Sequence, residues 1–280
     1  RPYIFSLDPE VAHDLAIKSL KFNFIPESFF KVENEGVLET NLFGKKLKNP
    51  VGLAAGFDKS AEVYNSLYKF GFGFVEVGTI TPKRQIGNPK PRIFRLEKDN
   101  ALINRLGFNN DGLDIVANRI SENIPNGILG INIGPNKETK NKTNDFLKCL
   151  SILHSKADYI TVNISSPNTE GLRDFHDKSS LSKLLGTLVS EKKKKRINKP
   201  IFIKISPEHS LAVKSPKVAE LWHPTLNYPI TPSDVFNSSM KFYTWQCKEF
   251  DHHIWEDKVY SLTRKDRSKK KPFCKIWQRI

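Results

Sequence analysis

Glycine is absent from the last quarter of this 280-residue chain. All 15 glycines lie between Gly36 and Gly186, and residues 208–280 contain none, although average usage of about 7% predicts roughly five in a segment of that length. Glycine closes tight left-handed turns at little cost, so a segment without it is poorly suited to repeated strand–helix units. We therefore separate 208–280, which also holds all four tryptophans, from the rest and expect a helical or poorly ordered appendage there.

Cysteine and long apolar runs are also scarce. Cys149, Cys247 and Cys274 are odd in number and show no Cys-x-x-Cys spacing. This pattern excludes a disulfide framework, is typical of a reducing compartment, and predicts neither a structural zinc site nor any other bound metal. No run approaches 18 apolar residues, so no helix is expected to span a membrane.

Positive charge, by contrast, is abundant. The 45 Lys and Arg residues exceed the 30 Asp and Glu residues by 15, a balance typical of proteins that bind nucleic acids or anionic membranes. Lysine runs are also common on solvated surfaces, and we interpret Lys192–Arg196 as the exposed end of a helix, where positive charge is favourable. We therefore expect no nucleic-acid partner. A hydrophobic content of 38% is enough for a buried core and excludes a disordered chain.

Residues 1–43 are predicted to form a small N-terminal helical region. An N-cap, a first-turn proline and an acidic residue occur in succession at Asp8–Glu10, and apolar residues at helical spacing follow through Leu20. A second short apolar segment spans residues 26–30. The periodicity favours ordinary packing of these segments over a shallow contact with a membrane. Because the chain opens with Arg1 rather than Met, we expect its natural start to lie further upstream.

After Asn49 the pattern changes to alternating strands and helices. Five short apolar runs are typical of buried parallel strands: Val51–Ala54, Phe74–Val77, Ile128–Ile133, Tyr159–Ile164 and Ile201–Ile205. Helical patterns follow four of them, at Ala61–Phe70, Asp111–Ile120, Asn144–Ser155 and Ser179–Lys195. Such alternation predicts a parallel sheet with right-handed crossovers.

The length of these units favours a (β/α)8 barrel. Five units take up about 160 residues, so eight would need about 250, which is the usual size of a barrel. A doubly wound sheet is the alternative, but no Gly-x-Gly-x-x-Gly follows the first strand. We predict an α/β fold in which residues 44–207 form the first part of a TIM barrel, incomplete after strand five.

Polar or glycine-containing segments follow every predicted strand, at 55–59, 78–79, 132–134, 163–168 and 204–207. In a barrel they all fall on one rim, the C-terminal face where sites are built. Asparagine carboxamides both donate and accept, so four of them suit the edge of an isoalloxazine or pyrimidine ring: Asn104, Asn132, Asn163 and Asn168. Lys59 and Lys204 offer cations for a ligand carboxylate or a reduced flavin. Ser166 has no histidine at a fixed spacing, so an acyl-transfer triad is not supported.

Five sequence motifs closely resemble those of dihydroorotate dehydrogenase. They are Asn49–Lys59 (NPVGLAAGFDK), Gly78–Pro82 (GTITP), Pro91–Leu96 (PRIFRL), Asn104–Asn109 (NRLGFN) and Asn163–Thr169 (NISSPNT). The N-terminal Asp8–His13 (DPEVAH) resembles the membrane-associated, quinone-using class 2 enzymes. The resemblance covers residues 1 to about 207 and is specific because the motifs occur in order.

The resemblance implies an FMN enzyme of pyrimidine synthesis that oxidises dihydroorotate to orotate and passes the electrons to a membrane quinone. It implies a peripheral membrane protein, at the cytoplasmic face of a bacterial membrane or alternatively at the mitochondrial inner membrane. The implied FMN contacts are Ala55, Gly56, Lys59, Thr79, Asn132, Asn163 and Lys204. The implied substrate contacts are Lys59, Asn104, Arg105, Leu106, Gly107, Phe108, Asn163 and Asn168. Ser166 matches the catalytic base, and His13 and Arg95 match positions lining the quinone tunnel.

The tail 208–280 departs from the family. The second half of a dihydroorotate dehydrogenase supplies further strands and the glycine-rich loops that hold the FMN phosphate, and a glycine-free segment cannot offer those loops. We therefore expect a frameshifted or mis-joined tail and weak or no FMN binding. Two alternatives stay open: a truncated, inactive product, and a flavin barrel that acts on RNA, such as a tRNA dihydrouridine synthase. The second lacks its cysteine proton donor, because Cys149 falls within a predicted helix.

Overall fold

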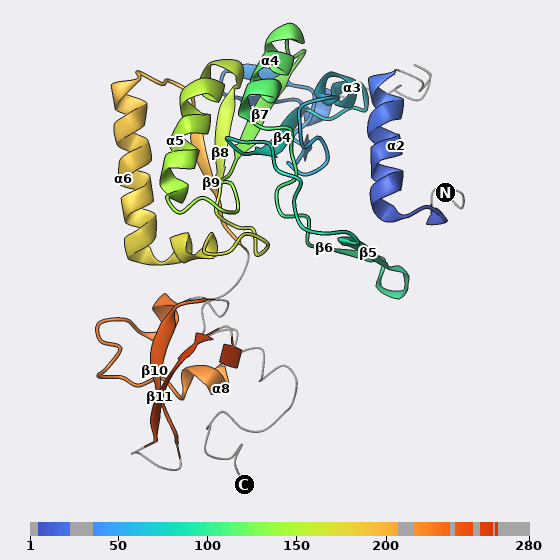
Figure 1. The fold of residues 1–280 in the computed structure, drawn as a ribbon. Coiled ribbons are helices and arrows are strands. Elements are labelled where there is room, and N and C mark those ends of the chain that lie inside the picture. The colour runs from blue at the N-terminus through green and yellow to red at the C-terminus, as the bar shows by residue number, and fades with distance from the viewer. Residues whose placement is uncertain are drawn as a thin grey trace. The chain divides into compact units, whose positions relative to one another are not determined.

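The computed structural model describes residues 5–22, 36–206, 216–235, 239–248, 253–259 and 261–262. The chain divides into two compact units. The first comprises Arg1–Asn163 and Leu188–Lys204, and the second comprises Ile164–Thr187 and Ile205–Ile280. The chain therefore passes from one unit to the other after Asn163, after Thr187 and after Lys204. Figure 1 shows the elements of both units, coloured from blue at the N-terminus to red at the C-terminus.

A five-stranded parallel sheet forms the centre of the first unit (Figure 1). Its strands are β3 (Gly52–Leu53), β4 (Phe74–Ile80), β7 (Ile128–Ile133), β8 (Tyr159–Asn163) and β9 (Ile201–Lys204). They follow one another in space in the same order as in the chain. A doubly wound sheet would reverse this order at a switch point. Among the described residues the sheet does not close, because β3 and β9 each pair on one side only. The predicted α/β fold of the barrel type, incomplete after its fifth strand, is confirmed.

Pairing between neighbouring strands brings their carboxyl ends to the same edge. Ile133 of β7 pairs with Ile80 of β4 and with Val162 of β8. Asn163 of β8 pairs with Lys204 of β9. Strand β7 is buried along its whole length, as expected of a parallel strand covered on both faces. The polar residues at the ends of β4, β7, β8 and β9 consequently share one edge of the sheet.

The four predicted helices are present as α3 (Tyr64–Lys69), α4 (Leu113–Glu122), α5 (Lys142–Leu153) and α6 (Lys178–Lys194). Helix α5 contacts β7 and β8, and α3 contacts β4. Helix α3 begins later than the predicted residue 61 because the Asp58 carboxylate accepts hydrogen bonds from the amides of Glu62 (2.7 Å) and Val63 (2.8 Å). These bonds hold residues 58–63 in a loop that leads into the helix. Burial raises the pKa of Asp58.

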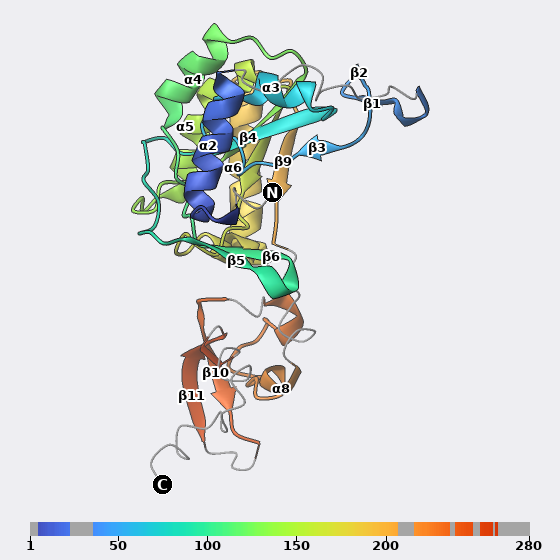
Figure 2. The same ribbon diagram turned by 90° about the vertical axis from the view of Figure 1, so that its right-hand side faces the viewer.

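The sequence analysis missed two hairpins of the first unit. One pairs β1 (Thr40–Leu42) with β2 (Lys45–Leu47), and the other pairs β5 (Ile93–Leu96) with β6 (Ala101–Asn104). Figure 2 shows β1 and β2 beyond the edge strand β3. Phe43 at the turn of the first hairpin packs against the rings of Tyr159 (5.7 Å between centroids) and Phe202 (5.9 Å). The first hairpin therefore contacts aromatic residues of β8 and β9.

Helix α2 (Pro9–Lys21) begins as predicted. The Asp8 carboxylate accepts hydrogen bonds from the amides of Glu10 (2.9 Å) and Val11 (3.2 Å), and Pro9 occupies the first turn. The second predicted segment, 26–30, lies outside the described residues. No helix within the described ranges is both long enough and apolar enough to cross a bilayer.

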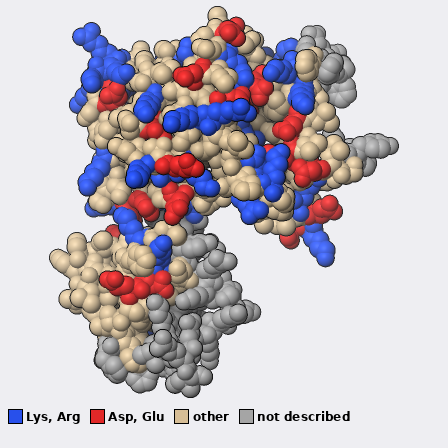
Figure 3. Space-filling view, in the orientation of Figure 1, with Lys and Arg blue, Asp and Glu red and all other residues tan. Residues whose placement is uncertain are grey.

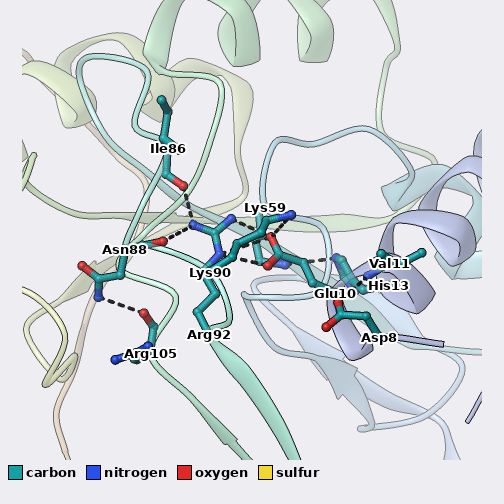
Figure 4. A network of polar contacts seen from close by, with 10 residues as sticks. All are labelled: Asp8, Glu10, Val11, His13, Lys59, Ile86, Asn88, Lys90, Arg92 and Arg105. Atoms are coloured by element: carbon teal, nitrogen blue, oxygen red, sulfur yellow. Dashed lines mark hydrogen bonds and ion pairs between the residues drawn. The ribbon is translucent and has the colours of Figure 1, made fainter. Parts of the chain in front are cut away.

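A buried ion pair ties α2 to the loop before β5 (Figure 4). Arg92 Nη2 donates to Glu10 Oε1 at 2.6 Å, and Arg92 Nε donates to Glu10 Oε2 at 3.0 Å. Arg92 Nη1 donates to the carbonyl oxygens of Ile86 (2.6 Å) and Asn88 (2.9 Å). The hydrogen bonds and charge of Arg92 hold the pKa of Glu10 below its usual range. One guanidinium thus joins the helix to residues 86–88.

The second unit contains a β-hairpin rather than the helical or poorly ordered tail that we expected. Strand β10 (Phe242–Gln246) pairs antiparallel with β11 (Ile254–Lys258), and a short helix α8 (Pro216–Ala219) precedes them. Trp245 is fully buried in a core with Val218, Leu221, Trp222, Val235, Tyr243, Val259 and Leu262. The Cys247 amide donates to the carbonyl oxygen of His253, so the pairing extends to residues that lie six positions apart in the chain. A connection of that length does not need the glycine of a two-residue turn.

Replacing Arg92 tests the ion pair. Arg92→Met leaves the buried Glu10 carboxylate with only the exposed Lys90 ammonium, 3.4 Å away, so the free energy of unfolding should fall by about 2–3 kcal/mol at neutral pH. The Glu10 pKa is depressed in the folded state, so this contribution is present above the ordinary carboxylate pKa. The deficit should narrow as the pH falls through the folded-state pKa. Urea unfolding followed by circular dichroism measures it, with the exposed Arg105→Met as control. An equal loss in both variants, or a deficit independent of pH, would contradict this assignment.

Candidate functional site

Three polar side chains meet at the carboxyl ends of β4, β7 and β8. Thr79 Oγ1 donates to Asn132 Oδ1 at 2.6 Å. Asn163 Nδ2 lies 3.1 Å from both Asn132 Oδ1 and Thr79 Oγ1. All three side chains are buried. The structure therefore brings together three of the residues predicted to contact the flavin, and they come from three different strands.

A glycine permits this close approach. Gly78 has a φ of +113°, and a Cβ built there would lie 2.5 Å from the carbonyl oxygen of Asn132. Any other residue would force β4 away from β7. Gly134 has a similar function: its Cβ would meet the Thr79 methyl group at 2.6 Å and the Phe108 ring at 3.0 Å. Phe108, predicted for the substrate, therefore lies close to Thr79 of the rim.

The sequence analysis missed an acidic residue that lies next to this cluster. Glu76 of β4 accepts a hydrogen bond from Asn132 Nδ2 through Oε1 at 2.8 Å, and one from Thr161 Oγ1 through Oε2 at 2.8 Å. Glu76 is flanked by Val75 and Val77, both fully buried. A carboxylate within such a short apolar strand was the signal that would have revealed it.

Glu76 and the predicted flavin residue Lys204 line one cavity of about 410 Å³ on the sheet. Ala54, Thr161 and Tyr159 also line it. Burial raises the pKa of Tyr159, and the neighbouring Glu76 carboxylate raises it further. The cavity thus combines an acid, a cation and two hydroxyl groups below the ends of the strands.

Lys59 contacts a residue to which the resemblance gave a different function. Lys59 Nζ lies 3.0 Å from Nε2 of His13 on α2 (Figure 4), and both line a second cavity of about 360 Å³. Burial lowers the pKa of Lys59. Burial and then the charge of Lys59 lower the pKa of His13. The predicted substrate lysine and the predicted quinone histidine are therefore in direct contact.

The other predicted residues of the first unit lie in loops and at hairpins. Ala55 and Gly56 follow β3, and Gly56 has a φ of +117°. Asn104 is exposed at the end of β6, opposite Ile93. Arg105 donates to the carbonyl oxygen of Pro91 (3.0 Å from Nη2).

The loop before β5 holds the segment that ends at Phe108. Gln85 Nε2 donates to the carbonyl oxygen of Gly107 at 2.9 Å, and Leu106 and Asn88 pair through a backbone bond. Arg95 donates to the carbonyl oxygens of Phe5 and Leu7 (2.7 Å to Leu7), ahead of α2. Arg95 thus contacts the N-terminal region just before α2, whereas His13 belongs to α2 itself.

Ser166 and Asn168 belong to the second unit. They follow β8 closely in the chain, and the Asn168 amide donates to Ser166 Oγ at 3.2 Å. Arg173 Nε donates to the carbonyl oxygen of Ser165 at 3.1 Å. These bonds shape the segment that carries the predicted base, and its role stays a prediction.

A singly wound parallel sheet with polar side chains gathered at its carboxyl edge defines a β/α-barrel protein with its site on that rim. Residues 37–243 match the model of the family described as dihydroorotate dehydrogenase. The chain therefore belongs to the dihydroorotate dehydrogenase family, whose members are flavin-dependent enzymes, and the predicted resemblance is confirmed.

Individual relatives agree with this assignment. The dihydroorotate dehydrogenase (quinone) of Bartonella henselae is 50% identical over 214 residues, which cover 75% of this chain and 58% of that protein. Its namesake in Christiangramia forsetii is 48% identical, with 74% and 63% covered. The ligand-free DHODH of Eimeria tenella has a similar structure, with a TM-score of 0.66 at 41% identity, covering 74% of this chain and 64% of that one. The chain thus spans about 60% of the length of these relatives.

The match does not favour an RNA-acting flavin barrel. The charge distribution agrees: on the face shown in Figure 3, Lys and Arg side chains of the first unit are interspersed with Asp and Glu rather than gathered into one patch. On that face, the positive charge is therefore part of a mixed surface.

Residues 218–276 also match a second family, described as a probable treble clef zinc finger domain. This match runs against our expectation that the chain has no structural zinc site. The described part of the chain contains no group of three His, Cys, Asp or Glu side chains that could hold a metal ion. Cys247 is buried there, and Cys274 lies outside the described residues. The described donors alone do not fit a zinc ion, so we derive no chemistry from one.

Removing the charge of Lys59 should change the titration of His13. In Lys59→Met the pKa of His13 should rise toward the ordinary histidine value of about 6.5, because a nearby cation no longer disfavours the imidazolium. It should stay somewhat depressed, because burial persists. Nitrogen-detected NMR of the imidazole during a pH titration measures this, with His13→Gln to assign the signal. Lys18→Met is the control, because Lys18 lines the same cavity without contacting His13. An unchanged His13 pKa in Lys59→Met would contradict the contact.

Proposed function

We propose that this chain oxidises dihydroorotate to orotate, with FMN as the bound cofactor and a membrane quinone as the final electron acceptor. The observation that carries the proposal is the buried cluster of Thr79, Asn132 and Asn163 at the ends of three parallel strands, in a chain of the dihydroorotate dehydrogenase family. Amide and hydroxyl groups held in fixed positions suit the edge of a flat ring that carries both donors and acceptors.

The donor set fits a flavin ring. Amides and a hydroxyl face the rim, Lys204 supplies a cation, and Ala55 and Gly56 keep the turn after β3 free of bulk. Lys59, Thr79, Asn132, Asn163 and Lys204 would hold the cofactor, which supplies the hydride-accepting chemistry when bound. Residues 44–206 thus carry the ring-binding part of the site.

The substrate would lie over the same rim. The Lys59 ammonium pairs with its carboxylate, and Asn163, Asn168 and the 104–108 segment orient the ring. Ser166 Oγ takes the proton from carbon 5. A free serine is a weak base, so this step needs a pocket closed to water and a group that accepts the proton in turn. Support for Ser166 comes from its position three residues after Asn163.

Electron transfer to a quinone would take place on the α2 side. His13 lies on α2, and Arg95 binds the carbonyl groups just before it. We propose that residues 1–43 form this acceptor region and associate peripherally with a membrane. The cytoplasmic face of a bacterial membrane and the mitochondrial inner membrane are the two candidate locations.

We propose that a segment of different origin is joined to the family sequence within residues 208–280, where the family match, which reaches residue 243, overlaps the match that begins at residue 218. The match of 218–276 to another family supports joining, because a shifted reading frame has no reason to encode a known family and a buried tryptophan core.

Substituting Ser166 tests the catalytic proposal. With FMN supplied in excess, Ser166→Ala should reduce dihydroorotate-dependent dye reduction by about 10²–10⁴-fold, because general base catalysis contributes that much. Ser165→Ala, a change of the neighbouring serine, should stay close to wild type. FMN affinity should be equal in all three proteins. Wild-type protein without any dihydroorotate-dependent reduction at saturating FMN would overturn the proposed function.

The missing phosphate loops predict an unusual cofactor preference. Because the described rim contacts suit only the ring, FMN and riboflavin should bind with similar, weak affinity, differing by less than about threefold, whereas a phosphate site with several charge-assisted bonds would add far more. Quenching of flavin fluorescence measures both affinities. FMN binding more than about tenfold tighter than riboflavin would contradict this, and so would a purified protein that retains one flavin per chain.

A further inference from the structure

The hydrogen bonds of the rim form a chain with one direction. Asn163 Nδ2 donates to Thr79 Oγ1, and Thr79 Oγ1 donates to Asn132 Oδ1. Asn132 Nδ2 then donates to Glu76 Oε1. Every donor in this chain points toward Glu76. Four side chains on three strands thus share a single order of donors and acceptors.

Most of the side chains in this series of hydrogen bonds are able to exchange their donor and acceptor roles. Asparagine and threonine side chains each carry both donor and acceptor capacity, so a network built from them alone has two arrangements of similar energy. An ionised carboxylate only accepts. Glu76 is therefore the one side chain of the series that cannot become a donor. The Asn132 carboxamide must consequently turn Nδ2 toward Glu76 and Oδ1 toward the rim.

A second contact holds the carboxylate in place. Thr161 Oγ1 of β8 donates to Glu76 Oε2 at 2.8 Å, so the two oxygens are bound by different strands. Asn132 and Thr161 are paired neighbours on β7 and β8. The carboxylate of β4 thus bonds both of them, one through each oxygen.

We propose that Glu76 is a positioning residue that sets the direction of the Asn132 carboxamide and, through it, the pattern of donors and acceptors that the rim presents to a planar ring. The role of this pattern in holding a flavin rests on the proposed function. The orientation itself is a property of the free protein. Glu76 does not touch the ligand in this assignment and acts through Asn132.

An exchange of carboxylate and carboxamide between positions 76 and 132 tests this. In Asn132→Asp, two carboxylates face each other, so the protein should lose stability and FMN affinity. In the double variant Glu76→Gln with Asn132→Asp, the introduced carboxamide at position 76 donates to the introduced carboxylate at position 132, whose other oxygen still accepts from Thr79 and Asn163. The repulsion is removed and the carboxylate at position 132 again meets a donor on each side, so the double variant should recover at least about tenfold in FMN affinity over Asn132→Asp, a coupling that a double-mutant cycle isolates. A double variant no better than Asn132→Asp would overturn the proposal.

The single variant Glu76→Gln gives a readout without any ligand. In the wild type, NMR should show one slowly exchanging side-chain amide pair for Asn132. In Glu76→Gln it should split or broaden, because both directions become available. Thr161→Val is the matched control: it removes a different donor to the same carboxylate and should leave one Asn132 amide pair. An unchanged, single Asn132 signal in Glu76→Gln would reject the positioning role. If the wild-type protein binds no FMN, that result contradicts only the proposed function. The NMR comparison then still tests whether Glu76 sets the direction of the Asn132 carboxamide.

Discussion

The parallel register of β4, β7 and β8 determines where every polar side chain of the rim lies. Side chains alternate between the two faces of a strand, so a slip of one residue in β7 would turn Asn132 away from Thr79 and Glu76. Apolar residues on both faces prevent this slip: Ile131 and Ile133 of β7 are fully buried, as is Val162 of β8. Packing of the apolar core therefore positions the polar cluster, which contributes little to choosing the register.

The parts of the fold that depend on burial were predictable from the sequence. The bounds of β7, Ile128–Ile133, were predicted without error because the strand is an uninterrupted apolar run. The β5–β6 hairpin was missed because all four residues of β6, Ala101–Asn104, are exposed, so no pattern of burial marks it. In the tail, the lack of glycine was a poor guide, because Trp245 and its neighbours build a core around a hairpin whose longer connection does not require glycine.

The residues of the candidate site also divide into those that the sequence made predictable and those that it did not. Thr79, Asn132 and Asn163 were identifiable because each ends a recognisable strand, and strand ends meet at one edge. Glu76 was missed because its partners depend on which residues face each other across strands. The contact of Lys59 with His13 spans 46 positions in the chain and depends on how α2 lies. Long side chains that bridge distant segments leave no local spacing in the sequence.

Two charged residues with opposite hydrogen-bonding roles organise the polar interior of the first unit. Arg92 only donates, and it fixes how α2 and the 86–88 loop meet. Glu76 only accepts, and it fixes the direction of the amides at the rim. The partners of Arg92 are a carboxylate and two backbone carbonyls, which only accept, whereas the amides and hydroxyls around Glu76 satisfy more than one arrangement. In a chain with 75 charged residues, most charges lie on a mixed surface where single substitutions have small effects. These two differ because Arg92 joins acceptors of two separate segments, and Glu76 removes the ambiguity of a whole network.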